Sequence, residues 1–102
     1  MGDRLLMQVI DSRTPEQGRH NADTFGPVIY CHWSGSSARD ICAALRERMR
    51  NRPHDLSYTT ARAAQIAMGD DTDALSFGVW NAAARLTAKD SHGDAGVVLI
   101  DC

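Results

Sequence analysis

Residues 25–40 read Phe-Gly-Pro-Val-Ile-Tyr-Cys-His-Trp-Ser-Gly-Ser-Ser-Ala-Arg-Asp. The first part of this stretch is rich in β-branched and aromatic residues, which favour a strand, and the second part is a Gly/Ser turn that leads into a helix. The N-terminus of a helix presents unpaired backbone N–H groups and a partial positive charge. Because residues 34–37 are all Ser or Gly, an anion could approach this junction closely. We therefore expect the fold to be organised around this stretch and a binding site to lie at its junction.

The chain before this stretch predicts one strand and a long loop. Alternation from Leu5 to Ile10 places Leu5, Met7 and Val9 on one face of a strand, and the other face is also largely apolar. The segment from Asp11 to Thr24 is polar and rich in turn-forming residues, so we expect an exposed hairpin connection. The second strand is expected over about Pro27 to Trp33.

Two helices are expected after the Gly/Ser turn. The first has one apolar stripe at helical spacing and stops before Pro53. The second runs from about Leu56 to Met68, with Asp55 or Ser57 as its N-cap, and its expected buried side includes Tyr58. The loop expected between the two helices is short, so we expect the helices to lie side by side in an antiparallel arrangement.

Two further strands are expected in the C-terminal third. The segment from Leu75 to Trp80 alternates, and Gly78 within it leaves a gap over the sheet beside Trp80. Residues 81–89 fit neither element clearly, and we expect an irregular segment or a short helical turn. Val97 to Ile100 is a continuous apolar run, which is typical of a central strand covered on both faces.

These elements predict one domain, residues 1–102, with the order β-β-α-α-β-β. The expected fold class is α+β, with an antiparallel or mixed four-stranded sheet and the helix pair on one face. Two helices can cover only one side of such a sheet, yet three of the strands are apolar on both sides. We therefore expect a second copy of the chain to cover the other side, in a homodimer or a larger assembly.

Composition narrows the class of protein. The formal net charge is −2, so no nucleic-acid partner is expected, and no apolar run approaches the length of a membrane span. The start of the chain lacks the pattern of an export signal, which favours a cytoplasmic location. Cys31, Cys42 and Cys102 are odd in number and widely separated, so we expect three reduced, buried thiols.

Two charged clusters have ordinary explanations. The arginines at the end of the first helix complement the helix dipole and indicate a solvated helix end, with a nucleic-acid contact patch as the alternative; they are Arg46, Arg48, Arg50 and Arg52. The run Asp70-Asp71-Thr72-Asp73 is too short for a calcium loop. We therefore expect no metal site.

The sequence does not favour an enzyme. Strand alternation places Cys31 and His32 on opposite faces, so they cannot act together as a nucleophile and a base. Neither a nucleophile elbow nor a phosphate-binding loop motif is present in the sequence. We expect no catalytic residue and no cofactor.

Four segments resemble a family of small uncharacterised proteins of phages and prophages. They are Met1-Gly-Asp-Arg4, Tyr-Cys-His32-Trp33-Ser-Gly35, Ser76-Phe-Gly-Val-Trp80-Asn81 and Gly-Asp-Ala-Gly-Val-Val-Leu-Ile-Asp101. The layout, with helices after the second strand of a sheet, is also similar to that of the Thoeris anti-defence sponges. Those proteins sequester cyclic ADP-ribose-type immune signals without cleaving them.

The resemblance implies a phage-encoded, non-enzymatic protein that sequesters a nucleotide-type immune signal in the host bacterial cytoplasm. A small phosphorylated nucleotide needs flat surfaces for its base, cations for its phosphates and amide partners for its ribose. The candidate ligand-binding residues are Arg4, Tyr30, His32, Trp33, Arg39, Arg62, Trp80 and Asn81. The alternative is a phage interaction protein that inhibits a host protein or nucleoprotein complex, as anti-CRISPR proteins do.

Overall fold

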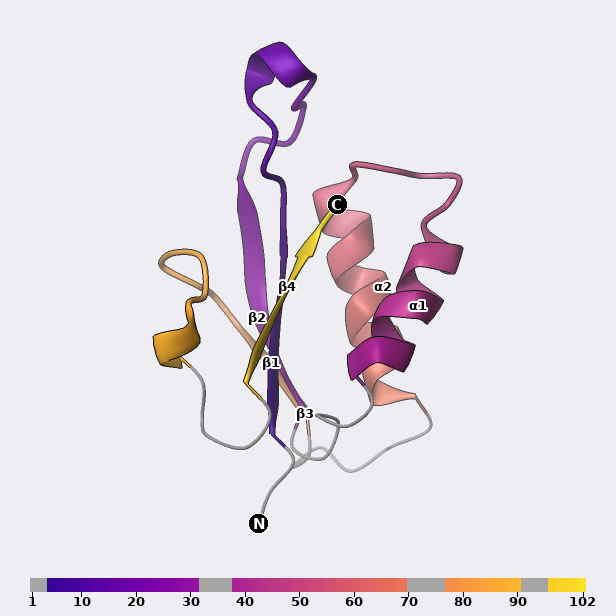
Figure 1. Cartoon of the computed structure of the whole chain (residues 1–102), viewed down its shortest axis with the longest axis vertical. Helices are drawn as coiled ribbons and strands as arrows, with labels where there is room; N and C mark the ends of the chain where they lie inside the picture. Colours follow the sequence, from indigo (N-terminus) through magenta and orange to yellow (C-terminus); the bar gives the residue numbers. More distant parts are fainter. Residues whose placement is uncertain (1–3, 32–37, 70–76, 91–95) are drawn as a thin grey trace.

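The computed structural model describes residues 4–31, 38–69, 77–90 and 96–102 (Figure 1). The elements are β1 (Leu5–Ile10), η1 (Pro15–Gln17), β2 (Phe25–Cys31), α1 (Ala38–Arg48), α2 (Leu56–Met68), β3 (Phe77–Trp80), η4 (Ala88–Asp90) and β4 (Val97–Asp101). The strand order in the sheet is β3-β2-β1-β4. β1 pairs antiparallel with β2 and parallel with β4, and β2 pairs antiparallel with β3. The predicted α+β class is confirmed, and the sheet is mixed.

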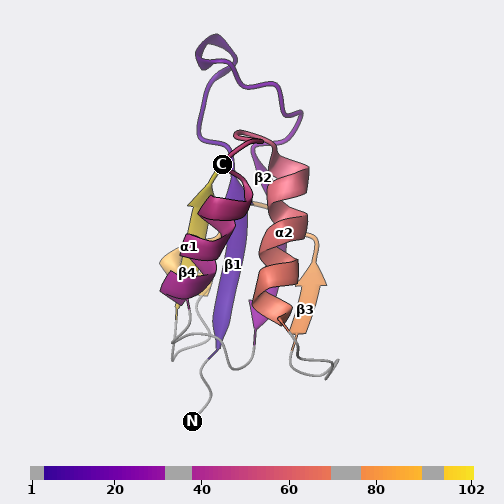
Figure 2. The same cartoon turned by 90° about the vertical axis from the view of Figure 1, so that its right-hand side faces the viewer.

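The helix pair covers one face of the sheet, as predicted (Figures 1 and 2). α1 and α2 run in opposite directions beside each other in both views. The residues of β1 that face them are Leu5, Met7 and Val9, none more than 1% exposed. They pack with Ile29, Cys31, Ile41, Leu45, Leu56 and Ala63 in the main core. Alternation along β1 therefore grouped correctly the three side chains that face the helices, although both faces of this strand are buried.

α2 begins and ends where the sequence predicts. The Asp55 side chain accepts a hydrogen bond from the backbone N–H of Tyr58, and Gly69 follows the last turn with a φ of 55°. The predicted buried side of this helix is wrong at Tyr58, which is 45% exposed. The buried residues are Leu56, Thr59 and Ala63 instead, because helical periodicity leaves the rotation of a helix about its axis open by about one residue.

Gly26 sets how closely α2 approaches β2. A Cβ atom at this position would lie 2.9 Å from Oγ1 of Thr60, which is shorter than the contacts that Cβ atoms make in proteins. The Thr60 hydroxyl donates a 2.8 Å hydrogen bond to the carbonyl of Leu56, and a β-branched side chain has few rotamers in a helix. The contact therefore has little freedom to relax.

Replacing Gly26 by Ala is expected to reduce the free energy of unfolding by about 1 to 2 kcal/mol, the usual cost of overpacking. Urea denaturation would measure this loss. In a double-mutant cycle, Thr60→Ala should recover most of it, because the two positions are in contact. Additive losses in the double variant would contradict this explanation.

The second face of the sheet is covered in part by the segment that follows β3. Leu86 from this segment is buried and packs against Leu6 and Val28. Gln8, which is fully buried on the same face, accepts a 2.8 Å hydrogen bond from the backbone N–H of Leu86. The sequence-based argument for a second copy of the chain did not take into account that this segment covers part of the second face of the sheet. Self-association stays a prediction.

The position predicted for the last strand is wrong. β4 lies at one edge of the sheet and pairs with β1 along one side, rather than lying between two strands. Val98 and Ile100 pack against the helix-side core, whereas Leu99, which points to the other face, is 42% exposed. Among the described helices, none could cross a membrane. Of the cysteines, Cys31 is buried, and Cys42 and Cys102 are half-buried.

The connection between β1 and β2 is anchored to the body of the protein, so it is not simply an exposed loop. Asp11 is buried and holds Arg13 and Asn21 through its carboxylate. The Asn21 side chain in turn accepts from the backbone N–H of Leu56 at 3.2 Å and donates to the carbonyl of His54 at 2.9 Å. These bonds fix residues 20–23 beside the start of α2.

Candidate functional site

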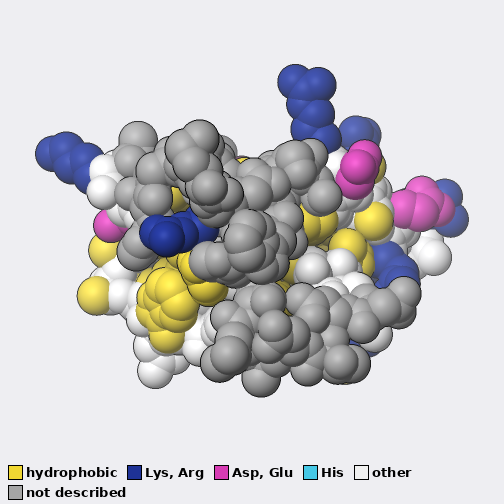
Figure 3. Space-filling model, turned by 90° about the horizontal axis from the view of Figure 1, so that it is seen from below, with side chains coloured by type: hydrophobic (Ala, Val, Ile, Leu, Met, Phe, Trp, Pro, Cys, Tyr) yellow, Lys and Arg dark blue, Asp and Glu magenta, His cyan; other side chains and the backbone are white. Residues whose placement is uncertain are grey.

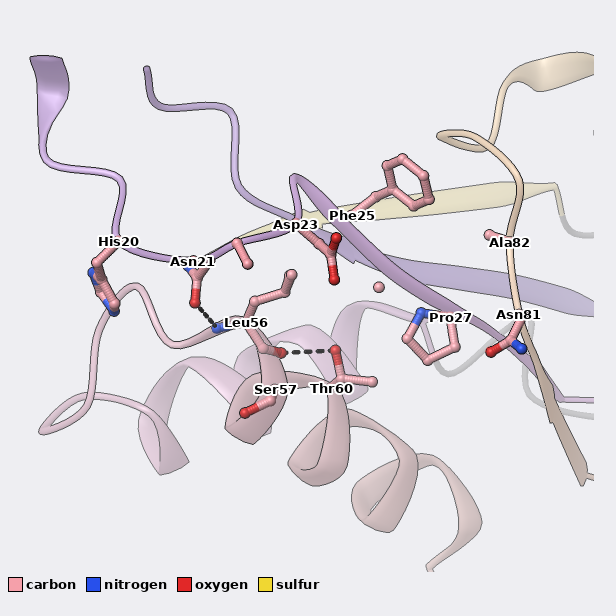
Figure 4. Close-up of a pocket in the computed structure, with 12 residues that line it drawn as sticks. His20, Asn21, Asp23, Phe25, Pro27, Leu56, Ser57, Thr60, Asn81 and Ala82 are labelled. Carbon is pink, nitrogen blue, oxygen red and sulfur yellow. Dashed lines mark hydrogen bonds between the residues drawn. The ribbon is translucent and has the colours of Figure 1, made fainter. Parts of the chain in front are cut away.

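The first turns of α2, the start of β2 and the segment after β3 enclose a groove of about 820 Å³ (Figure 4). It forms because the pairing of β2 with β3 runs only from Val28 to Cys31, so residues 25–27 of β2 border the groove. We call it the polar groove. It is lined by His20, Asn21, Ala22, Asp23, Phe25, Gly26, Pro27, Leu56, Ser57, Thr60, Asn81 and Ala82.

The polar groove combines apolar surface with hydrogen-bonding side chains. Phe25, Pro27 and Leu56 supply the apolar part. The Asn81 amide lies next to Pro27, and the Asp23 carboxylate lies on the β2 side of the groove (Figure 4). Donors and acceptors on an apolar surface are the usual lining of a small-molecule site.

The end of the groove at α2 carries the partial positive charge of a helix N-terminus. Ser57 in the first turn lines the groove. Asp55, the N-cap, forms a 2.9 Å ion pair with Arg52, and this pair together with the backbone N–H of Tyr58 lowers the pKa of the Asp55 carboxyl. At this helix end the backbone N–H groups of Leu56 and Tyr58 already donate to the side chains of Asn21 and Asp55.

An aromatic pair lies where β2 and β3 meet. The ring centroids of Tyr30 and Trp80 are 5.9 Å apart, with 34° between the ring planes. Trp80 is 45% exposed, and its ring lies 3.8 Å from where a Cβ on Gly78 would be. The predicted gap over Gly78 is therefore occupied by Trp80 itself. Hydrophobic side chains are also exposed together at the lower end of the molecule, beside a Lys or Arg side chain (Figure 3).

The structure brings together three of the predicted ligand-binding residues, Tyr30, Trp80 and Asn81. Tyr30 and Trp80 form the aromatic pair, and Asn81, the next residue in the chain, lines the polar groove. The three predicted cations lie on three different parts of the chain, and none of them lines this groove. They are Arg4 before β1, Arg39 at the start of α1 and Arg62 on α2.

The rest of the predicted junction cannot be placed. His32, Trp33 and the Gly/Ser turn of residues 34–37 lie outside the described residues. The same is true of the Asp70 to Asp73 run. Within the described ranges, no three His, Cys, Asp or Glu side chains gather in a way that could hold a metal ion.

Sequence reasoning missed most of the polar groove. Asp23 was assigned to an exposed connection, and Ser57 was considered only as a helix cap. No local pattern marks these residues as a site, because the groove joins three segments that are far apart in the chain. The only hint was the density of polar residues at positions 20–23.

No family model, curated protein or solved structure matches this chain. The resemblance to phage proteins therefore stays a prediction. The geometry of the chain itself is the basis for a functional inference.

Proposed function

We propose that this protein binds a small phosphorylated nucleotide in the polar groove and sequesters it without changing it chemically. In this role it is a phage-encoded sponge for an immune signal of the cyclic ADP-ribose or cyclic oligonucleotide class. The observation that carries the proposal is the polar groove, with its volume of about 820 Å³ and its lining. That volume falls within the range of known small-molecule sites, which is roughly 300 to 1,000 Å³.

Each part of a nucleotide has a partner of suitable chemistry in the groove. The apolar surface of Phe25, Pro27 and Leu56 suits the face of a base. The Asp23 carboxylate accepts hydrogen bonds from ribose hydroxyls, and the Asn81 amide both donates and accepts. A phosphate is favoured at the first turn of α2, where the partial positive charge of the helix lies.

The aromatic pair offers a second flat surface, and Trp80 is next in sequence to Asn81, which lines the polar groove. Stacking of a base on an aromatic side chain contributes about 1 to 3 kcal/mol. Trp80 is exposed enough to stack, and Tyr30 supports it from β2. A signal with two bases could therefore use both surfaces. Arg4, Arg39 and Arg62 are not needed for this arrangement.

A thermal-shift screen against cyclic ADP-ribose isomers, cyclic dinucleotides and cyclic trinucleotides tests the proposal. At about 100 times the Kd, a ligand that binds only the folded state adds roughly 2.7 kcal/mol to the free energy of unfolding and raises the Tm. Chromatography of the recovered ligand should return it intact. Recovery of a changed ligand would show an enzyme, and no shift with any nucleotide would contradict nucleotide binding.

Asn81→Ala is expected to weaken binding of the nucleotide found in that screen by about tenfold, because it removes a hydrogen-bonding side chain from the groove. Asn51→Ala is the matched control, since Asn51 is an exposed residue of the α1–α2 turn that does not line the polar groove. Titration calorimetry on both variants gives the two Kd values. Equal affinity in the two variants would place the ligand elsewhere.

One observation favours the alternative, an interaction protein that inhibits a host complex. Val79 and Trp80 are 51% and 45% exposed on β3, an edge strand of the sheet. Exposed apolar residues on an edge strand are typical of surfaces that bind another protein. If the nucleotide screen is negative, we expect Trp80→Ala to abolish capture of a host partner in a pull-down.

A further inference from the structure

A second groove, of about 710 Å³, lies between the C-terminal half of α1, the turn that follows it and the end of β4. We call it the arginine groove and define it by Arg46, Arg50, Arg52, Leu45, Met49 and Ile100. Its lining comes mainly from α1 and β4, whereas that of the polar groove comes from α2 and β2. Figure 2 shows α1 and β4 on one side of the molecule and α2 and β2 on the other. The two grooves share no residue among those that line them.

The three arginines differ in how they are held. Arg52 is fixed, because its Nε donates to Asp55 at 2.9 Å and its guanidinium lies 3.5 Å from the centre of the Tyr58 ring. Among the residues that the structure describes, Arg50 is paired only with Glu47, and both side chains are 69% exposed, so this pair is weak and exchangeable. Within the described part of the chain, Arg46 has neither a hydrogen bond nor an ion pair.

The carboxylates near the groove offset much of the positive charge of the three arginines. Glu47 and Asp101 line the groove together with the three arginines. The Asp101 carboxylate accepts hydrogen bonds from the backbone N–H and the hydroxyl of Ser12, so it is engaged with the β1–β2 connection. The net charge of these five side chains is about +1, and Asp55, which pairs with Arg52 from outside the lining, brings the sum to about zero.

The arginine groove also has an apolar part and a firm frame. Leu45 is buried, and Met49 and Ile100 are half-buried and pack against the main core. The backbone N–H of His54 donates to the carbonyl of Cys102 at 3.0 Å. This bond ties the α1–α2 turn to the end of β4, so the two walls of the groove are held together.

We propose that the arginine groove is a second ligand site, which takes a phosphate monoester carried on an apolar or aromatic body. The phosphate is held by Arg46, Arg50 and Arg52, since arginine binds phosphate oxygens in a bidentate manner. The body of the ligand rests against Leu45, Met49 and Ile100. This site is independent of the nucleotide site proposed in the polar groove.

Titration calorimetry with three simple probes tests this site. We expect 1-naphthyl phosphate to bind about tenfold or more tightly than either inorganic phosphate or 1-naphthol, because only the first probe uses both the cations and the apolar part. If 1-naphthol binds as well as 1-naphthyl phosphate, the arginines do not recognise an anion and the proposal fails. If inorganic phosphate binds as well, the apolar part has no role and the proposed ligand class is wrong.

Variants locate the bound probe. The double variant Arg46→Gln/Arg50→Gln is expected to weaken 1-naphthyl phosphate binding by about tenfold or more, because it removes two charge-assisted contacts at exposed positions. Arg48→Gln is the matched control, since Arg48 is an exposed arginine of α1 that points its Nη1 to Gln65 and does not line the groove. Asn81→Ala, in the polar groove, should leave the affinity unchanged. An equal loss in Arg48→Gln, or a loss in Asn81→Ala, would overturn the assignment.

Discussion

Gln8→Leu is expected to reduce the free energy of unfolding by about 3 kcal/mol, although Leu has a similar volume and is apolar. Gln8 is 0% exposed in the middle of β1. Its Oε1 accepts from the backbone N–H of Leu86 at 2.8 Å, and its Nε2 donates to the carbonyls of Gly26 at 2.9 Å and Ala84 at 3.3 Å. The buried N–H of Leu86 would lose its partner, and each unsatisfied buried group costs about 1 to 3 kcal/mol.

This side chain holds residues 84–86 against the second face of the sheet. Without it, Leu86 has no polar anchor that keeps it over Leu6 and Val28. For a domain of this size, a loss of about 3 kcal/mol corresponds to a decrease in Tm of roughly 10 to 20 °C. Urea denaturation and thermal melting would measure both quantities.

Gln65→Leu is the matched control for Gln8→Leu. Gln65 is exposed on α2 and its side chain makes only a 3.4 Å contact with Arg48. Its replacement should change the free energy of unfolding by no more than about 0.5 kcal/mol. If the two variants unfold at the same urea concentration, Gln8 does not anchor the segment.

Asp11→Asn is expected to lower the free energy of unfolding at pH 7 by about 2 to 3 kcal/mol. The Asp11 side chain is completely buried and forms a 3.0 Å ion pair with Arg13, whose side chain is 19% exposed. Removing one partner of a buried pair costs about 3 to 5 kcal/mol, and the partial exposure of Arg13 reduces that figure. The carboxylate also accepts from Asn21 at 2.8 Å, so the loss extends to the anchor of residues 20–23.

The pH dependence of this contribution follows from the pKa of Asp11. The hydrogen bonds from Arg13 hold this pKa far below its usual range, with a further contribution from Asn21, while burial acts in the opposite direction. A carboxyl whose pKa is lower in the folded than in the unfolded state stabilises the fold fully above its unfolded pKa, which is about 4. The stabilisation is lost as the pH falls below that value towards the folded pKa.

Urea denaturation of the natural chain and of Asp11→Asn at pH 7, 5, 4 and 3 would measure this dependence. The difference in the free energy of unfolding should be constant from pH 7 to about pH 5 and should shrink at lower pH. Asp23→Asn, which changes an exposed carboxylate of the same connection, should alter the value at pH 7 by no more than about 0.5 kcal/mol. A difference that grows towards pH 3 would contradict the role given to Asp11.

The candidate site could be predicted from the sequence only in part. Trp80 and Asn81 were identified because aromatic and amide side chains at the end of a strand have a recognisable chemistry. Asp23 and Thr60 were not, because each lies in a segment with an ordinary local explanation. The polar groove exists only where residues 20–27, 56–60 and 81–82 come together in the fold. No pattern within any one of these segments predicts that contact.

The arginines near Pro53 show the same limit. Their density was visible in the sequence and was explained by the dipole of the first helix. Whether they lie on open surface or line a groove depends on β4, which supplies Ile100 to the opposite wall. That information comes from a strand about fifty residues further along the chain.

The sequence by itself determined the local elements: the alternation of β1, and the start of α2 at Asp55 and its end at Gly69. These features depend on residues that are neighbours in the chain, through side-chain periodicity and helix capping. Only the tertiary structure decided that β4 lies at an edge, that Leu86 covers the second face and that two grooves form. The physical reason is that strand pairing and packing depend on contacts between residues far apart in sequence, which local patterns do not encode.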